Sequence, residues 1–218
     1  MVEACKLEED FVAGLRERQK DDRQARIARA AKAMFLEHGF EKATIEGIAQ
    51  ASGVSGVTVH NYYGTKSGIL LALVAENDRG LIAKLENKLT SCPLDVTEVT
   101  IAFAKTIMEH ALQNLQKVIW RQVIATVTAN SDSSISKPYF NLDRQLAQVL
   151  VLKMSRMQDA GALPESIAPD NLGRALFHLQ NARFIEFVCS EQLQIDDVLQ
   201  RIRNDLGALF AVQAVTST

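Results

Sequence analysis

A run of small and polar residues, GVSGVTVHN at positions 53–61, carries the clearest chemical signal in this chain. Ser55 is a good helix N-cap and predicts a short helix that begins at Gly56. Several side chains of that helix are not needed for a core, and they offer hydroxyl, methyl, imidazole and amide groups. These groups match the donors, acceptors and methyl groups that base pairs present in the major groove of DNA. The run therefore predicts a helix that contacts DNA bases.

Each residue type on this short helix has an expected partner on DNA. Asn61 pairs bidentately with adenine, and Val57 and Thr58 offer methyl contacts to thymine. His60 donates to guanine or to a phosphate, unless it only packs or faces solvent. Gly56 lets the backbone approach the groove wall. The expected base-facing set is Ser55, Gly56, Val57, Thr58, His60 and Asn61.

The residues before this run predict the elements that position it. Apolar side chains from Ile27 to Phe35 recur at helical spacing, which predicts a first helix over 23–38. Thr44 is a good N-cap for a second helix, and Gly53 suits a left-handed turn after it. Ala49 is small where two helices would cross, and Val59 would fill the angle between them. This pattern predicts a helix-turn-helix; the alternative is an ordinary helical corner.

The stretch from Ile27 to Leu71 resembles the DNA-binding domain of the TetR family of transcriptional regulators. The resemblance implies that Thr44, Tyr62 and Lys66 contact the DNA backbone. It departs from the family pattern at Val57, where glycine is usual, and at His60, where an aromatic residue is usual, so no operator sequence carries over. The matching residues are Ala30-Ala31, Phe35, Gly39-Phe40, Thr44-Ile45, Ile48-Ala49, Gly53-Val54-Ser55, Thr58, Tyr62-Tyr63, Lys66 and Leu70-Leu71.

Composition limits the remaining function classes. The 218 residues are 47% hydrophobic and 23% charged with a net charge of -2, which excludes a disordered polyelectrolyte and a chain-wide basic coat.

Residues 16–32 hold seven basic and three acidic residues, and they form either a solvated helix face or an arm that touches DNA. The three separated cysteines are too few for a disulfide framework or a zinc site. We expect a cytoplasmic protein that is not an enzyme and has no cofactor, metal or membrane partner.

Helical periodicity continues to the C-terminus and predicts an all-α chain with three parts. Residues 1–22 form an extension that is partly helical or flexible, 23–68 a three-helix helix-turn-helix domain, and 69–218 a helical effector-binding and dimerisation domain. A helix from Lys66 to about Thr90 would join the last two. The resemblance implies a homodimer that pairs through helices at about 169–190 and 195–213.

Aromatic and polar residues of the C-terminal part are candidates for an effector cavity or for plain core packing. Arg121 would favour an acidic or phenolic ligand. Cys189 is either a thiol sensor or inert. The candidate cavity residues are Phe103, Ile107, His110, Trp120, Arg121, Phe177 and Asn181.

These patterns together predict a sequence-specific, ligand-responsive transcriptional regulator. We expect a repressor that binds a double-stranded DNA operator and that an unidentified small molecule releases. In the alternative, the chain is a DNA-anchored protein whose helical body binds a protein partner.

Overall fold

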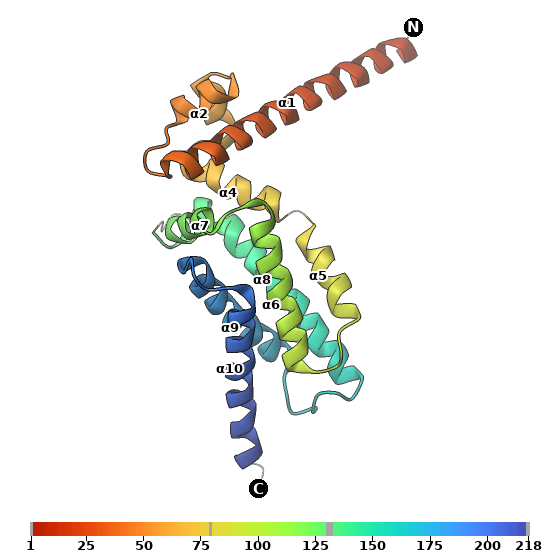
Figure 1. Ribbon diagram of the computed structural model, residues 1–218. Coiled ribbons are helices and arrows are strands. Elements are labelled where there is room, and N and C mark those ends of the chain that lie inside the picture. The colour runs from red at the N-terminus through yellow and green to blue at the C-terminus, as the bar shows by residue number, and fades with distance from the viewer. Residues whose placement is uncertain (1, 79, 130–132, 217–218) are drawn as a thin grey trace. The chain divides into compact units, whose positions relative to one another are not determined.

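The computed structural model describes residues 2–78, 80–129 and 133–216, and within these ranges the regular elements are all α-helices (Figure 1), which confirms the expected all-α class. The chain divides into two compact units, Met1–Val74 and Ala75–Thr218, here called the head and the body. The division falls six residues after the expected boundary, inside a helix. No described helix is long and apolar enough to cross a membrane.

The head contains α1 (Val2–His38), α2 (Ile45–Ser52), α3 (Gly56–Tyr63) and the start of α4 (Lys66–Asn77). Apolar side chains from each helix meet in its core, as the periodicity predicts. Deeply buried members are Ile27 and Phe35 of α1, Ile48 of α2, Val59 of α3 and Leu70 of α4.

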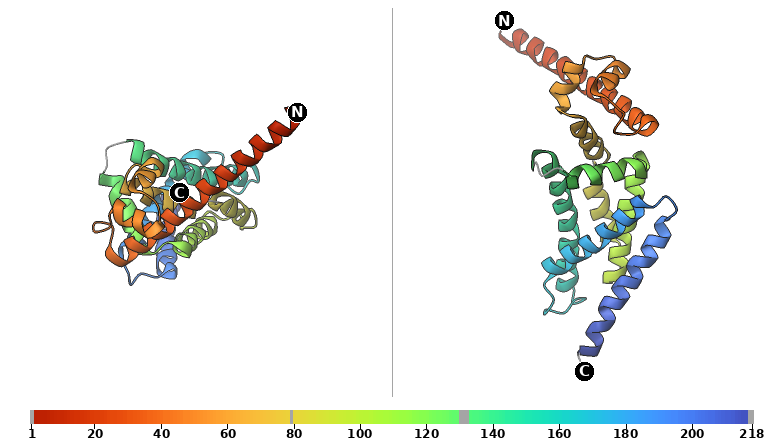
Figure 2. Two further views of the ribbon diagram at one scale, coloured as in Figure 1. Left: turned by 90° about the horizontal axis from the view of Figure 1, so that it is seen from above. Right: turned by 90° about the vertical axis from the view of Figure 1, so that its left-hand side faces the viewer.

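The first helix does not begin at residue 23, because α1 is continuous from Val2 and extends well past α2 and α3 (Figure 2). Polar pairs one helical turn apart support the helix between residues 19 and 26. Asp22 and Arg26 form an ion pair at 3.1 Å, and Arg23 donates to the side chain of Gln19. Such pairs each contribute a few tenths of a kcal/mol to an exposed helix. From Val2 onward, the segment before residue 23 is therefore helical and continuous with the rest of α1.

The expected helix from Lys66 to Thr90 is wrong, because the structure divides it into α4 and α5 (Leu81–Thr90). Gly80 precedes α5 with φ +83°, a left-handed backbone conformation that cannot continue an α-helix. Before it, the Asn77 amide donates to Asp78 Oδ1 at 3.1 Å. The break places the Asp78 carboxylate beside the core of the body.

The body consists of α5, α6 (Val96–Asn114), α7 (Lys117–Ala129), α8 (Ser133–Asp159), α9 (Pro169–Cys189) and α10 (Ile195–Thr216). The bounds of α9 and α10 agree closely with the helices expected at about 169–190 and 195–213. α8 and α9 pack closely because Gly173 has no side chain. A Cβ at Gly173 would lie 2.6 Å from the Val151 backbone. The body core is built around fully buried side chains such as Phe103, Leu150 and Phe187.

Candidate functional site

Two side-chain caps and a tight turn build the helix-turn-helix. Thr44 Oγ1 accepts a hydrogen bond from the Gly47 amide at 3.0 Å at the start of α2. Ser55 Oγ accepts one from the Thr58 amide at 3.1 Å at the start of α3. Gly53 lies between them with φ +67°. These are the cap and turn positions that the sequence predicts, so short-range signals define both helix starts.

The inner face of α3 is held firmly against the head. Val59 is fully buried, and Ile48 and Ala49 of α2 are buried with it. The Tyr63 hydroxyl donates to the Gln24 carbonyl of α1 at 3.3 Å. With its inner face and its last turn attached, α3 can present its other face in a defined orientation.

The outer face of α3 brings together the residues expected to contact bases. Val57 is 71% exposed, an unusual position for a branched apolar side chain on a short helix. His60 and Asn61 are also exposed, and among the described residues neither side chain has a hydrogen-bond partner. Gly56 lies half-buried at the start of the helix. The exposed face therefore offers an amide, an imidazole and apolar surface to an outside partner.

Ser55 and Thr58 are already partly engaged within the head. Their hydroxyl oxygens are 2.8 Å apart, in addition to the cap on the Thr58 amide. Each hydroxyl keeps some remaining capacity, since a hydroxyl can donate once and accept twice. We expect these two residues to fix the start of α3 more than to discriminate between bases.

The three residues expected at the DNA backbone have different surroundings. Thr44 is exposed, although its hydroxyl oxygen caps α2. Tyr62 is half-buried beside Tyr63, with ring centroids 6.3 Å apart. Lys66 Nζ donates to two carbonyl oxygens of the α1–α2 loop, those of Glu41 and Ala43, both at 3.1 Å.

Lys66 therefore has a structural role that sequence reasoning missed. Its ammonium also lies 4.5 Å from the centroid of the Phe40 ring, so it holds the loop by three contacts. An ammonium has three N–H donors, and two of them are used here. One donor remains for a phosphate. No local spacing signals this clamp, because its acceptors are backbone carbonyls more than 20 residues away.

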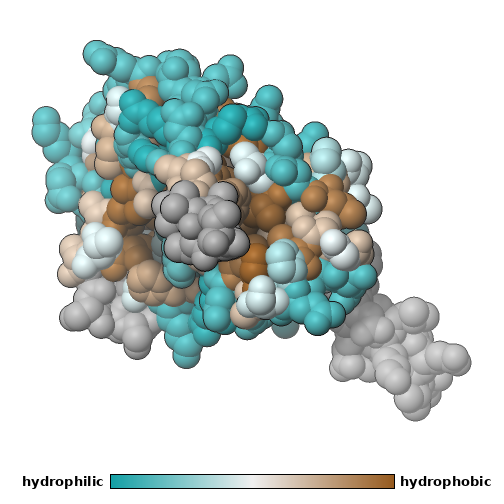
Figure 3. All heavy atoms as spheres, turned by 90° about the horizontal axis from the view of Figure 1, so that it is seen from below, coloured by the Kyte–Doolittle hydropathy of each residue, from teal (hydrophilic) through white to brown (hydrophobic). Residues whose placement is uncertain are grey.

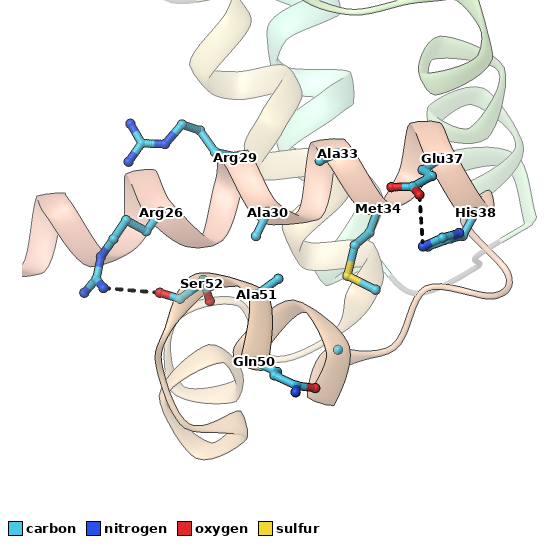
Figure 4. Close-up of a pocket in the computed structure, with 11 residues that line it drawn as sticks. Arg26, Arg29, Ala30, Ala33, Met34, Glu37, His38, Gln50, Ala51 and Ser52 are labelled. Atoms are coloured by element: carbon cyan, nitrogen blue, oxygen red, sulfur yellow. Dashed lines mark hydrogen bonds and ion pairs between the residues drawn. The ribbon is translucent and has the colours of Figure 1, made fainter.

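An open groove of about 840 Å³ lies between α1 and α2 of the head (Figure 4). Its polar groups contact one another. Arg26 donates to the Ser52 carbonyl at 3.2 Å, and His38 lies 3.9 Å from the Glu37 carboxylate. No α3 residue lines this groove, so it is separate from the outer face of α3.

The body encloses a small cavity of about 30 Å³ between α5, α6, α7, α8 and α9. Four residues from the sequence-based set line it: Ile107, Trp120, Phe177 and Asn181. The Trp120 ring is held in place, since its Nε1 donates to the Ala111 carbonyl at 2.9 Å. The remaining lining residues are Asp78, Leu81, Ala111, Tyr139, Leu142, Asp143, Leu146, Gln180 and Phe184.

The other three candidates lie outside the lining of this cavity. Phe103 is fully buried in the core. His110 is buried beside the cavity, with Nε2 2.6 Å from the Asn77 carbonyl oxygen. Arg121 donates to the Val188 carbonyl at 2.8 Å and pairs with Glu191 at 2.7 Å. The acidic or phenolic ligand expected from Arg121 therefore loses its basis.

Sequence reasoning missed three ionisable groups at the cavity: Asp78, Tyr139 and Asp143. Burial raises the pKa of Asp78 to about 6, although the Asn77 amide and His110 act in the opposite direction. Burial, followed by the charge of Asp78, raises the pKa of Asp143 to about 6. Burial, Asp143 and Asp78 together raise the pKa of the Tyr139 hydroxyl.

One sequence signal could have identified Asp143. Tyr139, Leu142 and Leu146 follow the helical spacing of an apolar stripe, and Asp143 falls on that same stripe. A carboxylate on an apolar stripe is unusual enough to suggest a functional group. Asp78 carries no such signal, because it lies in the break that the sequence did not predict.

Among the described residues, no group of three or more histidine, cysteine, aspartate and glutamate side chains could hold a metal ion. Two described cysteines are free thiols, Cys92 half-buried and Cys189 exposed.

Comparisons with known proteins agree with this architecture. Residues 27–73 match the family model for bacterial regulatory proteins of the tetR family. No curated protein sequence matches the chain. Among solved structures, the chain is similar to Thermus thermophilus FadR, a TetR-family transcriptional repressor in complex with lauroyl-CoA. The two sequences are 23% identical, the match covers 86% of this chain and 93% of that chain, and the TM-score is 0.63.

Two further structures show the same fold. A TetR-family regulator from Pectobacterium atrosepticum has 15% identity over 88% of this chain and 93% of that chain, with a TM-score of 0.64. A protein from Saccharomonospora viridis in complex with choline has 19% identity over 83% of this chain and 93% of that chain, with a TM-score of 0.60.

Proposed function

Because this chain belongs to the TetR family of transcriptional regulators, we propose that it is a homodimeric repressor that binds a specific DNA operator and is released by a small molecule. The observation that carries this proposal is the outer face of α3. An exposed amide, an exposed imidazole and a branched apolar side chain project from a helix whose inner face is buried. As members of this family are DNA-binding proteins, we assign the chain no enzymatic activity and place its action in the cytoplasm.

Contacts with the operator divide into two kinds. Asn61, His60 and Val57 lie on the exposed face of α3 and are suited to base edges, where one good bidentate contact contributes about 1–3 kcal/mol of discrimination. Thr44, Tyr62 and the remaining donor of Lys66 are suited to phosphates, which set position and not sequence. The exposed basic residues of α1 from Arg16 to Arg23 would add affinity that depends on salt.

Exposed faces of α9 and α10 support the homodimer. On α9, five exposed residues recur at alternating spacings of three and four: Ala175, His178, Ala182, Ile185 and Cys189. On α10, Leu209 is 57% exposed. Figure 3 shows several hydrophobic residues exposed among hydrophilic ones on the face seen from below. Helices with small and apolar residues at such spacing pack against a partner helix. A two-fold dimer would read two half-sites about 34 Å apart.

α4 provides a covalent route from the cavity to the head. It begins at Lys66, which clamps the head loop, and ends at Asn77, directly before Asp78 at the cavity. Its 12 residues make a helix of about 18 Å. A ligand that contacts Asp78 would act on the C-terminal end of α4, and a coupling of about 1–3 kcal/mol would be enough for a clear change in operator affinity. The ligand complexes of two structural neighbours support this reading.

The test is fluorescence anisotropy with the DNA immediately upstream of the coding region of this protein, at two salt concentrations and with unrelated competitor DNA. We expect tight binding that survives the competitor. His60→Ala should reduce affinity and base preference, whereas His38→Ala, an exposed histidine of the head outside α3, should leave both unchanged.

Equal effects of the two histidine substitutions would contradict the assignment of α3 to DNA bases. Specific DNA binding that responds to no small molecule would contradict ligand release. That result would favour the alternative in which the body binds a protein partner.

A further inference from the structure

The cavity of the body combines aromatic walls with negative charge. Trp120, Phe177 and Phe184 supply ring surfaces, and the rings of Trp120 and Phe184 meet edge to face with centroids 5.4 Å apart. Asp78 and Asp143 supply two carboxylates. No lysine or arginine lies among the described lining residues. His110 lies 3.7 Å behind Asp78 but outside the lining, so the cavity wall itself holds two acids, and ionising both in an apolar enclosure is costly unless a positive charge enters it.

A second and independent observation concerns Gln180 of α9. Its side chain is 1% exposed and lines the cavity, and among the described residues its Oε1 has no hydrogen-bond partner. A buried carbonyl oxygen without a donor costs about 1–3 kcal/mol. The cavity therefore lacks a hydrogen-bond donor at Gln180 as well as a positive charge.

We propose that this cavity binds an organic cation, a protonated amine, through Asp78, Asp143 and the aromatic rings beside them. The inference names the effector class and rests on the proposed function for its regulatory meaning. An ammonium N–H satisfies Gln180 Oε1, and the carboxylates balance its charge. The faces of Trp120 and the neighbouring aromatic rings attract cations. A carboxylate ligand would instead meet the like charge of two acids.

The cavity is too small to hold an organic cation without a change in its lining. About 30 Å³ is enough for little more than a water molecule, so an alkyl ammonium must displace lining side chains. A displacement of Asp78 would also move the C-terminal end of α4, because Asn77, the last residue of that helix, directly precedes Asp78.

Binding of the cation should depend on pH through the carboxylates. The groups that face the ligand are Asp78 from the α4–α5 break, Tyr139 and Asp143 from α8, and His110 of α6 behind Asp78. Both acids have pKa values raised to about 6, so they are protonated at pH 5 and charged at pH 8. Alkyl ammonium ions keep their charge over this range, as lysine does. Affinity for the cation should rise with pH, and affinity for a neutral analogue should not.

The probes are n-butylammonium, n-butanol and butyrate, which each contain four carbon atoms and are positively charged, neutral and negatively charged, respectively. The chain contains a single tryptophan, and Trp120 lines the cavity, so its fluorescence reports occupancy in the full-length protein without DNA. At pH 8 we expect n-butylammonium to bind at least about tenfold more tightly than n-butanol, with butyrate weakest. Asp143→Asn should remove the advantage of the ammonium and leave n-butanol unchanged. Asp170→Asn, an exposed aspartate of α9 that pairs with Arg174, is the matched control and should change neither.

Butyrate binding as tightly as n-butylammonium would overturn the proposal. So would an absent response to n-butylammonium, or an ammonium advantage that survives in Asp143→Asn. The probe comparison on the unaltered chain tests the proposal even if this variant does not fold. Adding n-butylammonium to the protein–DNA complex separates the two hypotheses. Cation binding without a change in DNA affinity contradicts the effector role in the proposed function and leaves the cavity assignment standing.

Discussion

Replacing Asp143 with asparagine should stabilise the body at pH 8 and change little at pH 4. Burial raises the pKa of Asp143 from 3.8 to about 6, so the folded chain binds this proton more tightly than the unfolded chain. The free energy of unfolding therefore falls as pH rises from about 4 to about 6, and it stays lower at higher pH. At about 1.4 kcal/mol per pH unit, the difference reaches about 3 kcal/mol. Asparagine keeps the shape of the side chain and has no charge to bury.

The assay is urea unfolding of both proteins at the two pH values, followed by the fluorescence of Trp120. Because this tryptophan lies in the body, its signal reports the body and not the head. Asp170→Asn removes an exposed carboxylate from the same unit and should shift stability by less than about 0.5 kcal/mol at either pH. The reasoning is refuted if Asp143→Asn is neutral or destabilising at pH 8, or if it stabilises equally at both pH values.

Three further substitutions test the packing and the DNA interface. Gly173→Ala should destabilise the body by about 1–3 kcal/mol in the same unfolding assay, because the added Cβ would lie 2.6 Å from the Val151 backbone; an unchanged midpoint would mean that α8 and α9 can separate freely. Lys66→Ala should weaken binding to every DNA sequence and lower the melting temperature of the head, while the exposed Lys42→Ala should leave the melting temperature unchanged. Loss of DNA affinity with no thermal effect would contradict the clamp. Asn61→Ala should relax preference at one base position by about 1–3 kcal/mol in a competition assay, and an unaltered preference would remove it from the base contacts.

Asp78 and Asp143 carry a stability cost, and the proposed cation site would give that cost a functional reason. Proteins commonly lose stability where a binding site needs groups that a core would exclude. A body without Asp143 would be more stable at neutral pH, yet it would lose a charge to which we assign the selection of the ligand. The stability and binding experiments on the same variant should therefore move in opposite directions.

The sequence by itself determined the helix-turn-helix, because the signals that define it act over a few residues. The caps at Thr44 and Ser55 and the turn at Gly53 each depend on a backbone group within three or four positions. The same local periodicity located α9 and α10. The exposed residues of α3 could be predicted as well, because the side chains that a short helix does not bury on its inner side must lie on its outer side.

Only the tertiary structure decided what lies opposite each buried face. The cavity joins Asp78, Asp143 and Gln180, which come from three elements far apart in the chain. Helical spacing shows that a residue faces inward but not which residue from another helix it meets. For the same reason the sequence could not show that Lys66 binds loop carbonyls or that Arg121 pairs with Glu191. Long-range contacts depend on how helices pack, and that packing is a property of the whole fold.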